Sequence, residues 1–409
     1  MSSETPLGGL KVIEFAGLAP GPFAGMILAD WGAEVIRLDR PPSEHGNTFT
    51  GDILTRHKRS IAINLKVPSG LALAKRLIES ADVLIDPFRP DVLEKLGLGP
   101  DVFLGDDGTN KRLIYARLVG FSRSGPHAHL AGHDLNYLAL GGVLSLLPGT
   151  SSHPSFPLNI LADFAGGGMM CAFGILIALY ERNRNGGLGQ VVENDMVSGA
   201  RYLSTNPLLA SFAHASMSNP PFADSDATSA SRMHNTLDGG APFYNLYDCA
   251  DGRWMSVACI EPKFYKIFLD RFLAALPAEF LHGRTQDVSA SHEQMNRDRW
   301  PQTREFFIDG FACYSREHWE RVFAGSDACT FPVLSPREAT RLASSSAAPF
   351  VHPNLSRSKH VPLSSNDTDV LHPGEHKDAI LNELGITHGE RAKLERDGAF
   401  GVQKGRPKL

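Results

Sequence analysis

Short apolar runs alternate with segments of helical spacing through the first half of the chain. Residues 10–16 are an apolar run, residues 20–33 carry Pro-Gly punctuation and then helical spacing, and residues 34–41 are a second apolar run closed by proline. This order predicts a βαβ unit. The alternation continues in the segments 59–66, 69–81, 82–88 and 111–121. The pattern therefore predicts an α/β fold with a mainly parallel, doubly wound sheet.

Two helices of this first half have predicted starts. Ser69 is the candidate N-cap of the helix over 69–81, because serine is a preferred cap residue. A long apolar helix is expected from Asp163 to about Arg182, followed by a turn, a strand and another helix. Its uncharged run, Phe164 to Tyr180, is shorter than the ~20 residues of a membrane span and has three consecutive glycines near its start, so we expect a buried core helix.

The composition changes after residue 209. Residues 210–240 are rich in Ser, Asn, Asp, Ala and Pro, which indicates a linker rather than a packed element. A hairpin with an Asp-Gly turn and several amphipathic helices follow, and they predict a smaller α+β domain. The predicted division is a large Rossmann-like domain over 1–209, a linker over 210–240, a small domain over 241–340, and a return segment with a C-terminal helix over 341–409 that joins the large domain.

Composition excludes several classes of protein. The chain has 409 residues, 42% apolar and 21% charged, with a formal net charge of -5, which is typical of an ordinary soluble protein without an electrostatic footprint for nucleic acid. Its five cysteines include no CxxC pair, so a disulfide framework or zinc ribbon is not expected and a reducing compartment fits better. No GxGxxG, GxxxxGK[ST], HExxH or GxSxG motif occurs, so neither a nucleotide cofactor fingerprint nor a metal site is predicted.

The two ends of the chain bear on its compartment. Acidic residues stand where the basic part of a secretory signal would be, so secretion is not expected. The last three residues, Pro-Lys-Leu, are similar to a peroxisomal address with proline in place of serine. The expected location is peroxisomal, or else cytoplasmic or mitochondrial.

One pair of residues has the chemistry of proton transfer. His133 lies between glycines that allow close approach of a ligand, and Asp163 lies thirty positions later at the start of the long apolar helix. Backbone N–H groups of that first turn can stabilise an oxyanion, and an imidazole facing a carboxylate makes a two-base system. Local spacing leaves other interpretations open: a loop histidine bonded to backbone, an aspartate that only caps the helix, and a glycine run, Gly166 to Gly168, that serves close packing.

Basic residues follow the strands of the predicted sheet. Arg40 and Arg89 end two of the strands, and Lys95 lies a few residues further on. Ligands of parallel sheets bind at the carboxyl ends of strands, so these side chains can gather around phosphates, although half of such residues are merely solvated. Phe88 can offer a stacking face for an adenine, or it can belong to the core.

The sequence as a whole resembles the class III coenzyme A transferase family, also called CaiB/BaiF. The likeness covers nearly the entire chain and rests on ordered motifs at residues 7–41, 82–100, 112–126, 132–142, 161–169, 241–254, 259–265 and 371–376. The resemblance implies a Rossmann-like large domain, a small domain, and an interlocked homodimer in which two chains thread through one another. It also implies an acyl-CoA thioester as substrate, with no separate cofactor.

The family has two branches, and the residues present select one of them. The transferases use the aspartate that corresponds to Asp163 to form a covalent CoA thioester, and they generally lack the histidine that His133 matches. The racemases pair the two residues. The resemblance therefore implies a racemase that inverts the α-carbon of 2-methyl-branched acyl-CoA thioesters through an enolate. The alternatives are a class III transferase with Asp163 as nucleophile, an epimerase of another acyl-CoA, and a CoA-binding regulatory protein without turnover.

The resemblance assigns further site residues. Glu261 matches the glutamate that supports the catalytic histidine, Tyr244 matches a nearby tyrosine, and Asp134 and Tyr137 match residues beside the acyl thioester. The expected CoA-binding residues are Arg40, Ile63, Phe88, Arg89 and Lys95. The chain departs from the family at Asn64, where aspartate is usual, and at Lys95, where some members have arginine. Neither departure touches the proposed chemistry. They leave the details of CoA binding undefined by the resemblance, since Arg and Lys are not interchangeable in bidentate phosphate contacts.

Overall fold

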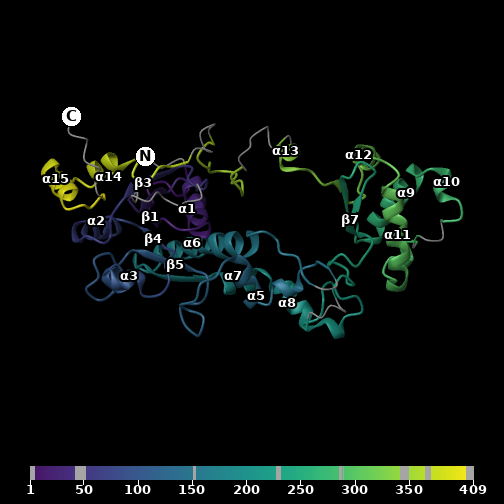
Figure 1. Ribbon diagram of the computed structural model, residues 1–409, viewed down its shortest axis with the longest axis horizontal. Coiled ribbons are helices and arrows are strands. Elements are labelled where there is room, and N and C mark those ends of the chain that lie inside the picture. The colour runs from purple at the N-terminus through teal and green to yellow at the C-terminus, as the bar shows by residue number, and fades with distance from the viewer. Residues whose placement is uncertain are drawn as a thin grey trace, which may run out of the picture. The chain divides into compact units, whose positions relative to one another are not determined.

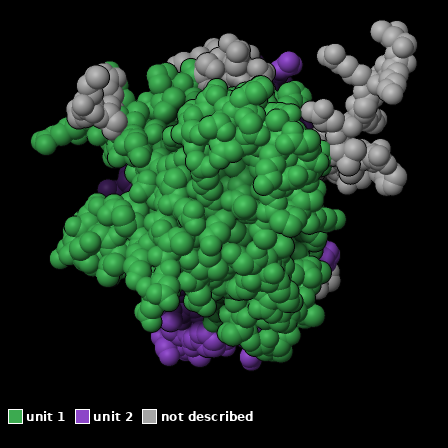
Figure 2. Space-filling view, turned by 90° about the vertical axis from the view of Figure 1, so that its left-hand side faces the viewer, with its two compact units in different colours: residues 1–141, 157–203, 348–409 green, residues 142–156, 204–347 purple. Residues whose placement is uncertain are grey.

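The computed structural model describes residues 5–41, 52–150, 153–226, 232–284, 288, 290–340, 350–363 and 370–401. The chain forms two compact units, which Figure 2 colours separately. Unit 1 contains residues 1–141, 157–203 and 348–409, and unit 2 contains residues 142–156 and 204–347. The finer division predicted from the sequence stays a prediction.

Unit 1 is built on a six-stranded parallel sheet (Figure 1). Its strands are β1 (Lys11–Phe15), β2 (Glu34–Asp39), β3 (Lys58–Ala62), β4 (Val83–Asp86), β5 (Ile114–Val119) and β6 (Gln190–Asp195). Their order is β3-β2-β1-β4-β5-β6, and every neighbouring pair is parallel. The doubly wound parallel sheet expected from the sequence is confirmed, and its strand order reverses between β1 and β4.

Helices cover both faces of this sheet because successive strand residues point to opposite sides. Val12 packs in one core with α1 and α6, whereas Ile13 and Phe15 pack in the other core with α2 and α14. The helices of unit 1 are α1 (Pro20–Asp30), α2 (Pro68–Glu79), α3 (Val92–Lys95), α4 (Pro100–Leu104), α5 (Asp134–Leu140), the π-helix η2 (Ile160–Met169), α6 (Met170–Arg182), α7 (Met196–Leu203), α14 (Lys377–Glu383) and α15 (His388–Arg396).

The start of α2 differs from the prediction. Val67 is the N-cap, Pro68 occupies the first helical turn, and no side chain caps the helix. Proline at this position has a backbone φ already set for a helix and lacks the N–H that would be left unpaired there. The helix therefore begins before Ser69, and the prediction of Ser69 as N-cap is wrong.

The long apolar helix begins three residues earlier than expected and opens as the π-helix η2, whose N-cap is Asn159. Asp163 lies inside its first turn, so the interpretation of Asp163 as an N-cap is wrong. The packing role of the glycine run is confirmed. A Cβ atom on Gly166 would lie 2.6 Å from the backbone nitrogen of Ala200, and one on Gly168 would lie 2.7 Å from the Pro20 carbonyl oxygen.

Only one face of this long helix is buried within unit 1. Among the described residues, Ile160–Arg182 is one helix of 23 residues that is long and apolar enough to cross a membrane, with a mean hydropathy of 1.8. Core helices of soluble proteins can pass the same test. In α6, Cys171 and Ile175 pack against the sheet, whereas Phe173 and Ile177 are each 51% exposed. The sequence predicted a buried core helix, and the structure buries one face of this helix and leaves the other exposed.

Unit 2 combines a small antiparallel sheet with helices, as predicted. Its sheet is β7 (Tyr244–Asp248), β8 (Trp254–Ala258) and β9 (Thr330–Pro332) in that order, and Gly252 adopts a φ of 71° in the β7–β8 turn. The helices of at least four residues are α8 (Thr205–Phe212), α9 (Pro262–Ala275), α10 (Ala278–Leu281), α11 (Trp300–Phe311), α12 (Arg316–Phe323) and α13 (Pro336–Ala339). Its core is largely aromatic, with Phe268, Phe272, Phe307, Phe311 and Trp319 fully buried.

Part of the stretch expected to be a linker is packed. The helix α8 covers the start of this stretch up to Phe212. Asn235 and Asp238 are each 1% exposed, and the Asp238 carboxylate accepts hydrogen bonds from the backbone N–H of Asn235 at 2.8 Å and of Gly240 at 3.1 Å. Polar composition misled the prediction here because these side chains satisfy backbone groups inside unit 2.

Candidate active site

A cavity of about 600 Å³ opens in unit 1 at the carboxyl ends of its strands. The segments after β1, β2, β4 and β5 all contribute to its wall, as do Gly132 and Tyr137 from the start of α5. This is the place where doubly wound sheets bind ligands, next to the reversal of strand order. The sheet topology therefore explains the position of the cavity.

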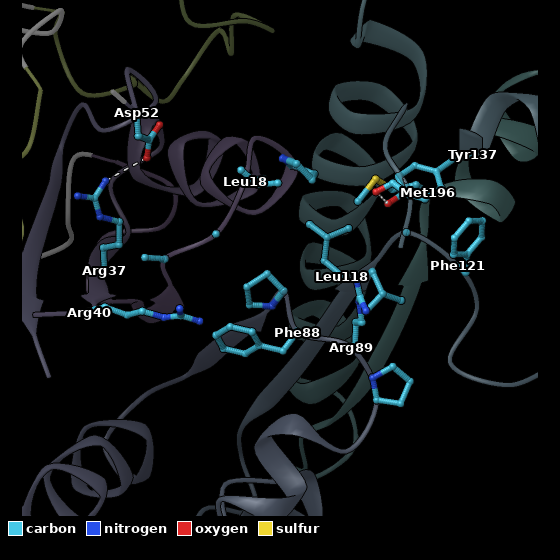
Figure 3. Close-up of a pocket in the computed structure, with 18 of the residues that line it drawn as sticks. Leu18, Arg37, Arg40, Asp52, Phe88, Arg89, Leu118, Phe121, Tyr137 and Met196 are labelled. Carbon is cyan, nitrogen blue, oxygen red and sulfur yellow. Dashed lines mark hydrogen bonds and ion pairs between the residues drawn. The ribbon is translucent and has the colours of Figure 1, made fainter. Parts of the chain in front are cut away.

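One end of the cavity is basic and aromatic. Arg40, Phe88 and Arg89 line it, and Arg40 and Phe88 point toward one another in Figure 3. Arg89 also donates a hydrogen bond from Nη1 to the His129 carbonyl oxygen at 3.3 Å. An arginine beside an aromatic ring offers contacts for a phosphate and for a flat base.

The cavity wall also includes residues of the return segment. Val370, Leu371 and Pro373 line it, and Arg37 Nη2 donates to the Leu371 carbonyl oxygen at 3.1 Å. The same arginine is paired with Asp39 at 2.8 Å and with Asp52 at 3.0 Å. Arg37 therefore ties the end of β2 to two distant parts of the chain.

Two expected CoA-binding residues lie elsewhere. Ile63 is 2% exposed and packs in the core between the sheet and α2, so its side chain is not part of the cavity wall. Lys95 is exposed at the end of α3 and does not line the cavity. The role of both residues in binding stays a prediction.

His133 is placed by the start of α5. It is the N-cap residue, its backbone N–H donates to Asn136 Oδ1 at 3.1 Å, and its carbonyl oxygen accepts from the N–H groups of Asn136 and Tyr137. The residue is exposed. These backbone bonds hold the main chain and leave the imidazole at the surface of unit 1.

Asp134 joins the start of α5 to the start of η2. Its Oδ2 atom accepts hydrogen bonds from the backbone N–H groups of Ala162 and Asp163, both at 2.8 Å, and the residue is 5% exposed. We call these two hydrogen bonds the Asp134 clip. Asp163 lies close enough to His133 for the charge of His133 to lower the pKa of Asp163. The clip also corrects an expectation: the N–H groups of Ala162 and Asp163 are paired with Asp134, so they are not open donors for an oxyanion.

Asp163 has an environment that favours its protonated form. Burial raises the pKa of its carboxyl group, and the nearby Asp134 carboxylate raises it further. The Asn159 amide, which donates to Asp163 Oδ2 at 3.3 Å, and His133 act in the opposite direction. A carboxyl group whose pKa is raised can serve as a proton donor closer to neutral pH.

Tyr137 lies beside the same pair. Its hydroxyl donates to the Gly132 carbonyl oxygen, and the edge of the Phe121 ring packs at a centroid distance of 5.0 Å. Burial raises the pKa of Tyr137 to about 12, and the charge of Asp163 adds to the effect while Arg89 opposes it. The hydroxyl therefore keeps its proton at neutral pH. The structure thus groups His133, Asp134, Tyr137 and Asp163.

The remaining two predicted residues belong to unit 2. Glu261 is the exposed N-cap residue of α9, and its carbonyl oxygen accepts from the N–H groups of Phe264 and Tyr265. Tyr244 is partly buried at the start of β7 and pairs with Ala258, three residues before Glu261. The two residues therefore share one end of the small sheet. Their approach to His133 and Asp163 stays a prediction.

Several residues of the site were not identified from the sequence. Asn136 fixes the backbone of His133, and Asn159 contacts Asp163. Asn136 is the third residue of α5, which is the spacing of a capping box, and Asn159 lies four positions before Asp163, which is the spacing of neighbours on a helix. Both signals are present in the sequence but weak. Within the described part of the chain, no group of three His, Cys, Asp or Glu residues has the arrangement of a metal site.

Comparison with known proteins adds the following likenesses. A model of CoA-transferase family III matches residues 7–368. The chain is 41% identical to alpha-methylacyl-CoA racemase of Homo sapiens over 96% of each chain, and 32% identical to succinyl-CoA–D-citramalate CoA-transferase of Chloroflexus aurantiacus over 63% of each. A crystal structure of a CAIB/BAIF family protein from Brucella suis shares the fold, with a TM-score of 0.71 at 22% identity over 93% of this chain and 99% of that one.

Proposed function

The chain belongs to CoA-transferase family III and is an enzyme that acts on acyl-CoA, and on this premise we propose that it is a racemase of 2-methyl-branched acyl-CoA thioesters. The observation that carries this proposal is the Asp134 clip, which sets His133 at the start of one helix and Asp163 in the first turn of another. An acid and a base held on two rigid elements suit proton transfer at a single carbon.

The proposed reaction moves one proton off the α-carbon and another onto it. The thioester carbonyl acidifies the α-proton, and neutral His133 removes it from one enantiomer, while ionised Asp163 removes it from the other. The planar enolate then takes a proton on its opposite face from the other residue of the pair. The pair must therefore hold one proton between its two residues at the start of each turnover. The raised pKa of Asp163 supports its role as the proton donor.

The CoA portion would bind at the basic end of the cavity. Arg40 and Arg89 are the proposed phosphate contacts, and Phe88 is the proposed stacking face for the adenine. Tyr137, which keeps its hydroxyl proton, would line the path toward the thioester. These contacts are made alike in the ground state and the transition state, so they contribute to affinity more than to turnover.

A homodimer is part of the proposal. In the assembled enzyme, Glu261 of unit 2 would orient the His133 imidazole, as a third group commonly does for a catalytic histidine. The apolar outer face of the long helix supports association. Met169, Phe173, Ile177 and Tyr180 follow one another at helical spacing and are between 51% and 65% exposed. A continuous apolar face of this kind is typical of a surface covered by another chain.

One alternative activity has a specific observation in its favour. Asp163 is a partly exposed carboxylate within electrostatic range of Tyr137, which lines the cavity. Because the Chloroflexus relative is a CoA-transferase, a transferase with Asp163 as nucleophile is the second candidate. The exposed His133 beside that carboxylate favours the racemase, because a covalent thioester on Asp163 does not need it. An epimerase of another acyl-CoA would use the same pair.

One experiment separates these activities. A single enantiomer of a 2-methylacyl-CoA is incubated with the enzyme in deuterium oxide, and stereochemistry and label are read together. A racemase places deuterium at the α-carbon and inverts it without an acceptor acid. Retention of configuration with no label, and transfer of CoA only when an acceptor acid is added, would contradict the proposal and favour the transferase.

The compartment is a separate proposal. We expect a peroxisomal location, or else a cytoplasmic or mitochondrial one, from the Pro-Lys-Leu tripeptide at the end of the chain. This tripeptide lies outside the described residues. Microscopy of a fusion that leaves the C-terminus free, compared with one that lacks the tripeptide, tests the proposal.

A further inference from the structure

The turn that follows β4 forms one wall of the cavity and is held from behind by charged side chains. Phe88 lies at its centre, and both polar groups of the Phe88 backbone are engaged. Asp86 Oδ1 accepts from the Phe88 N–H at 2.9 Å, and Arg123 Nη1 donates to the Phe88 carbonyl oxygen at 3.2 Å. The Phe88 ring packs edge-on against Phe15 at a centroid distance of 5.4 Å. The turn is therefore fixed at three points.

The two charged residues are themselves held in place. Arg123 Nη2 is paired with Glu94 Oε1 at 2.7 Å, and Arg117 binds the same carboxylate oxygen. Arg117 also pairs with Glu193 at 2.8 Å. Asp86, at the end of β4, lies opposite Arg117 in the strand register and is 1% exposed. None of these side chains takes part in the proton transfer proposed above.

We propose that Asp86 and Arg123 are positioning residues for acyl-CoA binding, because they fix the Phe88 peptide and thereby aim the Phe88 ring and the Arg89 guanidinium into the cavity. This inference rests on the proposed function only in taking CoA as the ligand. Figure 3 shows Phe88 and Arg89 projecting from this turn toward different parts of the cavity. A Cβ atom on Gly17 would lie 3.1 Å from Pro87, so the segment that follows β1 packs closely against the turn.

The state of the Asp86 carboxyl group adds a measurable signature. Burial raises its pKa to about 7, while the Phe88 N–H, Arg123 and Arg117 oppose the rise and Glu94 adds to it. These groups, together with Tyr115, are the charged and titratable groups that face it from the turn, from β5, from α3 and from the segment after β5. A charged acceptor makes a stronger hydrogen bond than a neutral one. We therefore expect the turn to tighten, and CoA to bind better, as the pH rises through about 7.

The test uses the full-length protein and CoA, with dissociation constants measured by titration calorimetry at pH 6 and pH 8.5. Asp86→Ala and Arg123→Ala should each weaken binding about tenfold at pH 8.5, the loss expected for one hydrogen bond. Asp86→Asn keeps an oxygen that accepts from the Phe88 N–H, so its affinity should stay within about threefold of wild type. Asp86→Asn should also lose the part of the pH dependence of CoA affinity that comes from the Asp86 carboxyl group. The titration of CoA itself contributes equally to both proteins, so the difference between their pH profiles isolates this part.

Glu193 offers a matched control variant for this test. Glu193→Gln removes another carboxylate from Arg117 on the side away from the turn, and it should leave the affinity for CoA unchanged. Unchanged affinity in folded Asp86→Ala and Arg123→Ala, or the same pH dependence in Asp86→Asn as in wild type, would overturn the inference. Failure of the wild type to bind CoA would instead refute the proposed function. Thermal melts of every variant separate loss of folding from loss of positioning.

Discussion

The hydrogen bonds of Asp134 allow a quantitative prediction about the proposed pair. One oxygen of this nearly buried carboxylate accepts from the N–H groups of Ala162 and Asp163 at 2.8 Å each. Hydrogen bonds to a charged group contribute roughly 1.5–3 kcal/mol each. Asp134→Ala should therefore destabilise the protein by about 3 kcal/mol, since two bonds to one oxygen are not independent. Asp134→Asn should destabilise the protein by about half as much, because a neutral acceptor makes hydrogen bonds roughly half as strong as those of a charged one.

The same substitutions should change catalysis in two ways. A shift of about 1 Å between reacting groups can cost on the order of 100-fold in rate, so Asp134→Ala should lose at least that much α-proton exchange. The Asp134 charge also raises the pKa of Asp163. Removing it lowers that pKa, so Asp163 ionises at lower pH. The rise of kcat/KM with pH, for the enantiomer that Asp163 deprotonates, should then move to lower pH in Asp134→Asn.

The assay follows deuterium incorporation from each enantiomer separately between pH 5 and pH 9, and urea unfolding gives the stability of each variant. Exchange in folded Asp134→Ala within threefold of wild type, together with an unmoved pH profile in Asp134→Asn, would refute the role given to the clip. A loss of stability without any loss of exchange would show that Asp134 holds the two helices but not the catalytic geometry.

Three other predictions follow from the same structure. His133→Ala and Asp163→Ala should each reduce racemisation by roughly 100–10,000-fold, measured by chiral analysis, while CoA esters still bind. Mixed refolding of inactive His133→Ala and Glu261→Ala chains should restore activity if the two residues meet across a dimer; no recovery in hybrids confirmed by mass would place them in one chain's site. Gly166→Ala should lower the free energy of unfolding by about 1–3 kcal/mol in urea, because its Cβ would collide with backbone, whereas Gly389→Ala, with open space around it, should not.

The sheet could be predicted from the sequence because burial on both faces makes each strand a short continuous apolar run. Residues 10–16 and 34–41 illustrate this, since β1 and β2 lie inside them. The predicted start of α2 is wrong because Pro68 begins the helix before Ser69, the predicted cap. The π-helical opening at Ile160 has no local signal comparable to the apolar run of a strand. Its glycines pack against Ala200 and Pro20, which are distant in the sequence.

The candidate site was predictable only in part. Spacing left several roles open for His133 and Asp163, and the family resemblance selected among them. The Asp134 clip joins positions 28 and 29 apart, and it forms only when the helices α5 and η2 have packed together. The bond from Arg123 to the Phe88 carbonyl oxygen likewise joins positions 35 apart. Hydrogen bonds between a side chain and a distant part of the backbone form through tertiary packing, so no local sequence pattern predicts them.

The return of the C-terminal residues to unit 1 has a consequence for synthesis on the ribosome. The backbone N–H of His376 donates to the carbonyl oxygen of Ser60, and Ile380 and Leu381 fill the core beside α2. The side-chain hydrogen bond between the same two residues spans 316 positions. At roughly 5–20 residues per second, β3 emerges about 16–63 s before the segment that covers it. During that interval the nascent chain exposes the apolar surface beside α2 that Ile380 and Leu381 later cover.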